Sequence, residues 1–400
     1  MLKKVIIVGS GYGGIRAAQT LAKNRDLEVT VVDTRPYHYL QTDIYDYIAN
    51  KTTITDISVS LVTLFFERET NVTFLQRKIV KVEPSENKLI TNFDEELYYD
   101  YLVMAIGSRT YFPSFIKGLA EHSHGVKSLK RAFEFKQKFE QAIYKQVESE
   151  GVCELNPNFN IVIGGAGLSG VEIAAAMAEY SSRFFAVGGY ACGGVAVHLI
   201  EASETILPGI DRYLVRKSKK RLEELGVNII TGDKILEVEE GKVHLGSGKT
   251  INMNFMIWTG GVEVRKIEGE GFEFNPRGQL KIDEFSRVKG FSNIFAIGDC
   301  AEVVNTKGKL LAPTAMVAEF GADVAAYNIA ALKHGKELKK IEFGLPGMLV
   351  ALGGYFTVGV VYGVRLSGLL GFFAKKAVSQ MYKWPLTHKC KKALLKSCNK

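Results

Sequence analysis

Two glycine-rich turns in this chain have the residue types and the spacing that bind the phosphates of a dinucleotide. The first reads GSGYGG at 9–14 and the second reads GAGLSG at 165–170, and each stands between an apolar run and an alanine-containing helical run. In such a G-x-G-x-x-G turn the first glycine permits the tight turn, the second admits the pyrophosphate, and the third lets helix and strand pack closely. Two turns therefore predict two bound dinucleotides.

An acidic residue follows each turn at the distance expected of a ribose-binding carboxylate. Asp33 ends the run VTVVD after the first turn, and Glu201 ends the run VAVHLIE after the second. A glutamate at this position accepts hydrogen bonds from both ribose hydroxyls and repels a 2′-phosphate. The second ligand is therefore expected to be NADH and not NADPH.

Glu172 is the candidate catalytic residue, and the residues alone leave its role open. It lies in the first helical turn after the second glycine turn, where the helix dipole stabilises a carboxylate whether or not it takes part in chemistry. The seven histidines and five cysteines are scattered without the spacing of a metal site or a disulfide framework. No metal is expected, and a reducing compartment fits best.

The elements around these residues predict an α/β fold with two Rossmann-like dinucleotide-binding domains and a C-terminal membrane-docking segment. Strand-like runs alternate with helical or polar segments in two sets, one beginning at residue 4 and one at residue 160. The second domain is expected to be inserted in the first. The predicted boundaries are 1–112 and 266–335 for the two parts of the first domain, 113–157 for a helical connection, 158–265 for the second domain, and 336–400 for the tail.

The tail carries the whole excess of positive charge. The formal net charge is +8, but residues 366–400 hold eight lysines and no acid, so the rest of the chain is balanced. No nucleic-acid partner is expected on this distribution. The apolar run at 5–8 is too short for a signal peptide.

The sequence of the tail predicts a hairpin followed by a membrane-surface helix. Residues 343–364 are uncharged over 22 positions, enough to cross a bilayer, but six glycines and Pro346 favour a β-hairpin made of GMLVALGG and YFTVGVVYGVRL. The next segment, LLGFFAKKAVSQMYKWPLTHKCKKALLK, mixes aromatic residues with lysines, a composition typical of a monotopic anchor on anionic lipid. A solvated or RNA-binding basic helix remains the alternative.

Several motifs together resemble the type II NADH:quinone oxidoreductases, which are single-subunit, non-pumping NADH dehydrogenases among the flavoproteins with two dinucleotide-binding domains. These motifs are VGSGYGGIRAA, PYHYLQTDIY, YDYLVMAIGS, GGAGLSGVEIA, LIEASETILPGID, WTGGV, NIFAIGDCA and APTA. The stretch 37–52 lacks the cysteines of disulfide reductases and NADH peroxidases, and GGAGLSGVE lacks a cysteine found near this motif in sulfide:quinone oxidoreductases.

The resemblance implies FAD in the first domain, NADH in the second, and transfer of two electrons to a membrane quinone without proton pumping. The implied FAD contacts are Gly9, Gly11, Tyr12, Gly13, Gly14, Asp33, Ala105, Gly107, Asp299 and Ala315. The implied NADH contacts are Gly165, Gly167, Gly170, Glu201 and Gly260. The resemblance also implies that Glu172 lies near the flavin and the nicotinamide, with a role in proton handling or substrate binding. It implies a peripheral position on the cytoplasmic face of the cell membrane.

The chain departs from this family where a quinone is expected. The family usually has Ala-Gln-x-x-x-Gln beside the flavin, whereas this chain has Met316 and Phe320 at the two glutamine positions, neither of which can form the amide hydrogen bonds. With Lys376 of the FAKK segment, these are the expected quinone-facing residues. Glu319 could supply a polar group nearby, but it is expected to be a solvated helix residue. A sulfide:quinone-type oxidoreductase and a non-catalytic NADH-responsive flavoprotein remain alternatives. The oligomeric state is open, with a homodimer among the candidates.

Overall fold

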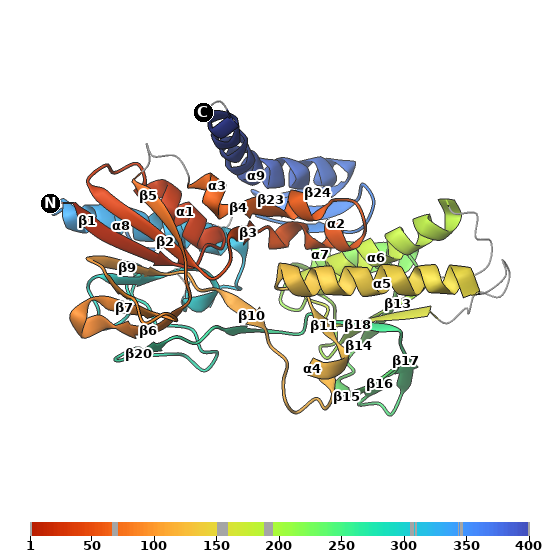
Figure 1. Ribbon diagram of the computed structural model, residues 1–400. Coiled ribbons are helices and arrows are strands. Elements are labelled where there is room, and N and C mark those ends of the chain that lie inside the picture. The colour runs from red at the N-terminus through yellow and green to blue at the C-terminus, as the bar shows by residue number, and fades with distance from the viewer. Residues whose placement is uncertain are drawn as a thin grey trace.

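A computed structural model describes residues 2–65, 71–149, 159–187, 195–304, 308, 310–342, 344 and 347–398. Cys153 and Cys192 lie outside these residues, as does Pro346. The described chain forms two α/β bodies side by side, and the C-terminal helix lies across the first of them and reaches toward the second (Figure 1).

The first body is built on a parallel sheet of order β21-β9-β1-β2-β5. Its strands are β1 Lys3–Val8, β2 Leu27–Asp33, β5 Val72–Gln76, β9 Tyr101–Met104 and β21 Ile294–Ala296. Helices α1 (Tyr12–Leu21) and α8 (Ala315–Lys333) pack together against this sheet. Because β1 lies between β2 and β9, the chain reverses direction across the sheet at the end of β1. That switch point is where ligands bind in open α/β sheets.

The second body repeats this plan with a parallel sheet of order β11-β18-β12-β13-β14. Its strands are β11 His124–Gly125, β12 Phe159–Gly164, β13 Val195–Glu201, β14 Asn228–Thr231 and β18 Phe255–Trp258. Its helices are α4 Leu119–His122, α5 Leu129–Ser149, α6 Leu168–Val187 and α7 Arg212–Glu224. The two sheets confirm the predicted fold class. Strand β11 lies within the stretch 113–157 that was predicted as a helical connection, so part of that stretch belongs to the second sheet.

Smaller antiparallel sheets flank the two bodies. One combines β20 Glu268–Gly269, which pairs in parallel, with β6 Ile79–Glu83, β7 Lys88–Thr91 and β8 Glu96–Tyr98. Another contains β15 Ile235–Glu239, β16 Lys242–Leu245 and β17 Thr250–Asn252. Strands β10 (Ser108–Thr110) and β19 (Val262–Val264) pair with each other where the chain passes between the bodies. Strands β3 (Tyr37–Tyr39) and β4 (Ser58–Ser60) pair near the short helices α2 (Ile44–Ile48) and α3 (Leu61–Leu64).

The tail forms three antiparallel strands where a two-stranded hairpin was predicted. These are β22 Gly347–Ala351, β23 Thr357–Val361 and β24 Val364–Gly368. The run YFTVGVVYGVRL folds back on itself because Tyr362 and Gly363 both adopt positive φ, 47° and 81°, as the central residues of a type I′ hairpin turn do. The prediction missed this turn because tyrosine is unusual at such a position.

Helix α9 (Leu369–Cys398) ends the described chain and contains Pro385. It packs on α3, β4 and the three strands of the tail, so one side of it is part of the folded protein. Among the described residues one helix, α8, has the length and hydropathy of a membrane span. Since 56% of that apolar window is buried inside the protein, α8 has the properties of a core helix.

Candidate functional site

Both glycine turns open on a single cleft of about 980 Å³. Of the predicted site residues, those that line it are Gly9, Gly11, Tyr12, Gly13, Asp33, Ala105, Gly107, Gly167, Glu172, Asp299 and Ala315. The others do not line it: Gly14, Gly165, Gly170, Glu201, Gly260, Met316, Phe320 and Lys376. The cleft therefore joins the carboxyl ends of the two parallel sheets.

The first glycine turn leaves space only on the side that faces the cleft. A Cβ on Gly9 would lie 2.3 Å from the carbonyl oxygen of Ala105, and one on Gly14 would lie 1.9 Å from the carbonyl oxygen of Gly9. Gly9 also has a φ of +105°, which disfavours any side chain. A Cβ on Gly11 would meet nothing within 4 Å. The bare backbone at the start of α1 thus forms a cradle that fits the pyrophosphate of a dinucleotide.

Asp33 is held at the end of β2 beside this cradle. Its Oδ2 accepts hydrogen bonds from the backbone N–H of Ser10 at 2.8 Å and from the Ser10 hydroxyl at 2.7 Å, and its Oδ1 accepts one from the Arg35 N–H at 2.9 Å. A carboxylate fixed in this way next to the phosphate cradle suits the ribose hydroxyls of a bound dinucleotide.

Asp299 also lines the cleft, and it belongs to a cluster that the sequence did not reveal. Its Oδ2 accepts a hydrogen bond from the Ser108 hydroxyl at 2.5 Å and forms an ion pair with Lys127 Nζ at 2.6 Å. Lys127 also donates to the Ser108 hydroxyl at 2.7 Å. Lys127 is one isolated lysine before a predicted helix, so nothing local in the sequence marks it. The cluster offers both hydroxyl and charged groups to a polar ligand chain.

The second glycine turn repeats the geometry of the first. Gly165 has a φ of +94°, and a Cβ there would lie 2.7 Å from the Cα of Gly260. A Cβ on Gly170 would lie 1.9 Å from the carbonyl oxygen of Gly165, whereas one on Gly167 would meet nothing within 4 Å. Gly260 therefore acts by allowing the strand ends to approach each other, not by lining the cleft.

Glu201 occupies the position in the second body that Asp33 has in the first. Its Oε2 accepts a hydrogen bond from the Ala166 N–H at 2.7 Å, and its Oε1 accepts one from the Ser203 N–H at 2.9 Å. The carboxylate is therefore fixed at the end of β13, where an adenosine ribose would reach it.

Glu172 is bound by the C-terminal part of the chain. Its Oε1 forms an ion pair with Lys375 of α9 and accepts a hydrogen bond from the Ala351 N–H of β22 at 3.0 Å. Lys375 also donates to the Leu349 carbonyl at 3.2 Å and lies 5.1 Å from the centre of the Tyr45 ring. Both charged groups line the cleft. The FAKK segment contained Lys375, but its pairing with Glu172 depends on how α9 docks.

The three predicted quinone-facing residues do not lie on the wall of the cleft. Met316 is half-buried and Phe320 is exposed, both in the first turns of α8. Lys376 donates to Asp46 Oδ2 at 2.8 Å instead. Glu319 is half-buried and so less solvated than expected. Burial raises the pKa of its carboxyl to about 7, while the nearby Arg16 opposes that rise.

The cysteines with described side chains do not line the cleft. Cys300 is buried behind Asp299 and donates to the carbonyl groups of Met104 and Ile297, and burial raises the pKa of its thiol to about 11. Cys390 is half-buried on α9. Neither lines the cleft, so neither is placed as a thiolate nucleophile there.

Comparison with known proteins agrees with this geometry. Residues 3–319 match the family described as pyridine nucleotide-disulphide oxidoreductases. A Staphylococcus aureus protein named type II NADH:quinone oxidoreductase is 26% identical over 387 residues, with 94% of each chain covered. The structure of an NDH2 from Plasmodium falciparum in complex with NADH superposes with a TM-score of 0.84 at 18% identity, covering 99% of this chain and 98% of that one.

A second solved structure has a different printed activity. The sulfide:quinone oxidoreductase of Aquifex aeolicus superposes with a TM-score of 0.81 at 18% identity, covering 97% of this chain and 92% of that one. At such identity the likeness concerns the fold. The family match is broader, and the chain belongs to the pyridine nucleotide-disulphide oxidoreductase family. It is a flavin- and NADH-dependent oxidoreductase.

Proposed function

We propose that this protein is an FAD-dependent NADH:quinone oxidoreductase that works at a membrane surface without pumping protons. The observation that carries the proposal is the single cleft shared by both glycine turns, which Asp33, Asp299 and Glu172 also line. The S. aureus relative named for this activity, aligned over 94% of the chain, supports the same reading. FAD, when bound, supplies the redox chemistry by accepting two electrons from a nicotinamide and passing them on.

The residues of the chain position the two ligands of this reaction. The turn at Gly9–Gly14 and the carboxylate of Asp33 would hold the adenosine end of FAD, and the cluster of Ser108, Lys127 and Asp299 would hold its ribityl part. The turn at Gly165–Gly170 and Glu201 would hold NADH. The N-terminus of α8 lines the cleft, and its partial positive charge would stabilise negative charge on a flavin there.

Glu172 and Lys375 are the proposed proton-handling groups. Both line the cleft and are mostly shielded from solvent, with 14% and 18% of their side chains exposed. A carboxylate can take up a proton and an ammonium group can release one when a substrate changes its protonation. The quinone-facing role of Met316, Phe320 and Lys376 remains a prediction, and the quinone type stays open.

The proposed membrane surface is the outward side of α9. Exposed apolar side chains on this helix are Leu369, Leu370, Phe373, Val378, Met381, Trp384, Leu394 and Leu395. Not all the lysines of the tail are free to meet lipid, because Lys375, Lys376 and Lys383 pair with Glu172, Asp46 and Asp56. The attraction to anionic lipid would come from lysines farther along the helix, such as Lys389, Lys391 and Lys392. A homodimer remains a candidate assembly.

Anaerobic stopped-flow spectroscopy of the purified holoprotein tests this proposal. NADH should bleach the visible flavin absorbance rapidly, NADPH should bleach it slowly, and a soluble quinone added afterwards should restore it. Bleaching by NADH without recovery by quinone would contradict the proposal that quinone is the electron acceptor. Rapid bleaching by sulfide would favour the activity for which the A. aeolicus neighbour is named. A long-lived reduced complex with slow turnover would favour a non-catalytic flavoprotein.

Substitution of Glu172 by Gln sharpens the same experiment. The amide keeps the shape but cannot carry a proton, so quinone reduction should slow by about 100-fold while FAD content is unchanged. The matched control is Glu179→Gln on the same helix, which pairs with Lys51 outside the cleft and should leave turnover near that of the wild type. Unchanged kinetics in Glu172→Gln would remove the proposed role.

A further inference from the structure

Helix α9 reaches the back of the first glycine turn through one tyrosine. The hydroxyl of Tyr382 lies 2.9 Å from Nε2 of His38, and Nδ1 of the same imidazole lies 2.9 Å from the carbonyl oxygen of Ser10. His38 is on β3, and 1% of the residue is exposed to solvent. A buried ring thus connects the C-terminal helix to the residue between Gly9 and Gly11.

The bonding partners fix the direction of these hydrogen bonds. The Ser10 carbonyl can only accept, so Nδ1 of His38 carries the hydrogen and donates. Burial lowers the pKa of His38 to about 4, which keeps the ring neutral near pH 7. In a neutral ring with hydrogen on Nδ1, Nε2 is an acceptor. The hydroxyl of Tyr382 is therefore the donor, and His38 has no other way to satisfy both nitrogens with these partners.

Ser10 continues the path into the ligand cleft. Its N–H and its hydroxyl both donate to Asp33 Oδ2. The path Tyr382–His38–Ser10–Asp33 therefore runs from α9 to the carboxylate proposed to hold the ribose of FAD. The ring of Tyr12, the first residue of α1, contacts the path from the side, with its centre 5.1 Å from that of His38 and 4.8 Å from that of Tyr382.

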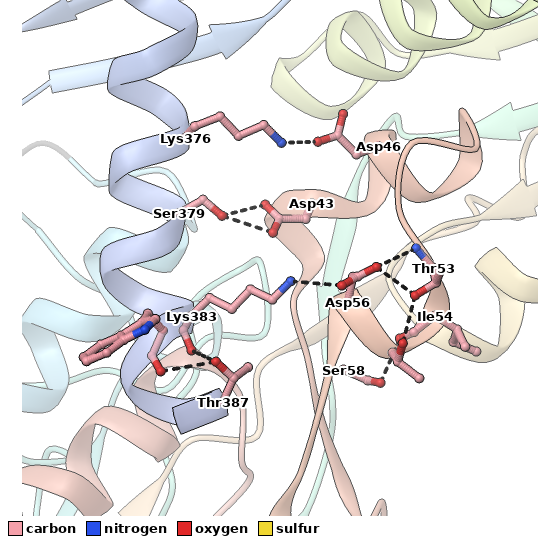
Figure 2. A network of polar contacts seen from close by, with 12 residues as sticks. Asp43, Asp46, Thr53, Ile54, Asp56, Ser58, Lys376, Ser379, Lys383 and Thr387 are labelled. Atoms are coloured by element: carbon pink, nitrogen blue, oxygen red, sulfur yellow. Dashed lines mark hydrogen bonds and ion pairs between the residues drawn. The ribbon is translucent and has the colours of Figure 1, made fainter. Parts of the chain in front are cut away.

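The same chain segment that carries His38 also anchors α9 (Figure 2). On α9, Lys376 donates to Asp46 at 2.8 Å, Ser379 donates to Asp43 at 3.1 Å, and Lys383 lies 3.9 Å from Asp56. The three carboxylates lie between β3 and β4 in the sequence. Docking of α9 and the placement of β3 are thus supported by one set of contacts, and movement of the helix would pull on the segment behind the glycine turn.

We propose that Tyr382 is a positioning residue for FAD, through which docking of the C-terminal helix and binding of the cofactor strengthen each other. The inference rests on the proposed function in one respect, namely that the first glycine turn binds FAD. Tyr382 acts by holding His38, which in turn fixes the Ser10 carbonyl and the orientation of the peptide in front of the pyrophosphate cradle. Because linkage is reciprocal, FAD must stabilise docked α9 by the same factor by which docked α9 strengthens FAD binding.

Substitution of Tyr382 by Phe tests the first half of this linkage. The ring keeps its contact with Tyr12, but Nε2 of His38 loses its donor and is left buried without a partner. The FAD dissociation constant of the apoprotein, measured by the change of flavin fluorescence on titration, should rise about tenfold. The matched control is Tyr362→Phe, which removes a hydroxyl from a residue that is 83% exposed and should leave FAD affinity unchanged.

Limited proteolysis tests the reciprocal half and uses the wild-type protein. Trypsin cleavage after Lys383 and Lys389 of α9 should slow by about tenfold when FAD is added to the apoprotein. In Tyr382→Phe the protection by FAD should largely disappear. A purely structural role for Tyr382 would change the cleavage rate equally with and without FAD.

The outcomes separate this inference from the proposed function. If wild-type apoprotein takes up no FAD, both fail. If the wild type binds FAD but Tyr382→Phe binds it within about twofold of the wild type, well below the expected loss, the inference is wrong and the proposed function stands. If FAD gives α9 no protection in the wild type, the linkage is also overturned, whatever the affinity of the variant.

Discussion

The two glycine turns are built alike and differ in what lies against them. In the first, the Gly9 N–H donates to the Val32 carbonyl at 2.8 Å, and in the second, the Gly165 N–H donates to the Ile200 carbonyl at 2.8 Å. In both, the residue after that glycine donates its N–H to the acid at the end of the next strand. The two turns therefore form the same set of local backbone hydrogen bonds.

The difference begins two residues after the third glycine. That position is Arg16 in the first turn and Glu172 in the second, and each forms an ion pair with a later helix. Arg16 pairs with Asp323 of α8 at 2.8 Å, with 45% and 36% of the two side chains exposed. Glu172 pairs with Lys375 of α9, and these side chains are 14% and 18% exposed. The equivalent position thus serves a surface contact in one body and a shielded pair inside the cleft in the other.

A second difference lies between Ser10 and Ala166. Ser10 adds a hydroxyl bond to the acid and has His38 behind its carbonyl, whereas Ala166 offers only its backbone N–H to Glu201. Only the first of these turns is connected to α9 in this way among the described residues. The two turns therefore share their backbone hydrogen bonds and differ in the groups that pack behind them, since the link to α9 in the first turn depends on His38 and Tyr382.

The third glycine of each turn provides the largest expected effect and tests whether the turns act independently. Gly14→Ala would bring a Cβ to 1.9 Å from a backbone oxygen, a clash that costs about 3 kcal/mol, so the variant should lose FAD. Gly170→Ala has the same clash in the second body and should keep FAD but lose NADH binding. Flavin content and NADH titration measure the two results, with circular dichroism as the control for folding. Loss of FAD from Gly170→Ala would contradict independent sites.

The two ion pairs give the next largest difference. Lys375→Met leaves Glu172 shielded without its counter-charge and should lower the free energy of unfolding by about 3 kcal/mol. Arg16→Met at the equivalent surface pair should lower it by less than about 1 kcal/mol. Urea unfolding of both variants checks this comparison. Equal losses would show that the shielding of the second pair has no energetic consequence.

Glu201, the acidic residue that follows the second glycine turn, should determine the preference for NADH over NADPH. Glu201→Gln keeps an acceptor for the ribose hydroxyls but removes the charge that repels a 2′-phosphate, so the preference for NADH over NADPH should fall about tenfold, equivalent to about 1.4 kcal/mol. The ratio of the two kcat/KM values measures it. Glu204→Gln, on the exposed loop just after the strand, is the control and should keep the ratio. An unchanged ratio in Glu201→Gln would show that other residues discriminate between NADH and NADPH.

The smallest expected effect concerns pH and the surroundings of Arg16. Burial raises the pKa of Glu319 from 4.5 to about 7 in the folded protein. The folded state then binds more protons than the unfolded state between these values, so the free energy of unfolding should decrease as pH rises through this window. Glu319→Gln should flatten that decrease and be more stable by about 1 kcal/mol above pH 7, allowing for partial exposure. Unfolding by urea at several pH values checks it, and a parallel decrease in both proteins would contradict the assignment.

Much of the fold could be predicted from local sequence patterns. Both Rossmann-like bodies could be predicted because the parts of each motif are close together in the sequence. A strand, a glycine turn, a helix and an acidic residue follow one another in a fixed order. The third strand of the tail was missed because Tyr362 adopts a positive φ, which its residue type does not signal. The exposure of Glu319 was overestimated because its neighbours include Arg16 and Tyr382, which belong to helices distant in the sequence.

The contacts that distinguish the site are long-range in the sequence. Glu172 and Lys375 are 203 positions apart, Lys127 and Asp299 are 172 apart, and His38 and Tyr382 are 344 apart. None of these pairs has a spacing that a helix or a strand would impose. They could not be predicted because each depends on how one whole element docks on another.

The sequence by itself determined where two dinucleotides meet the chain, because the requirement for glycine at a tight turn and the approach of helix to strand act within about thirty residues, the length of a βαβ unit. Only the tertiary structure decided that both turns open on one cleft and that Glu172 receives a lysine from α9. It also decided that a tyrosine of that helix stands behind the first turn. The reason is that side-chain charge and hydrogen bonding specify a kind of partner, while the packing of the elements selects which residue of that kind comes within reach.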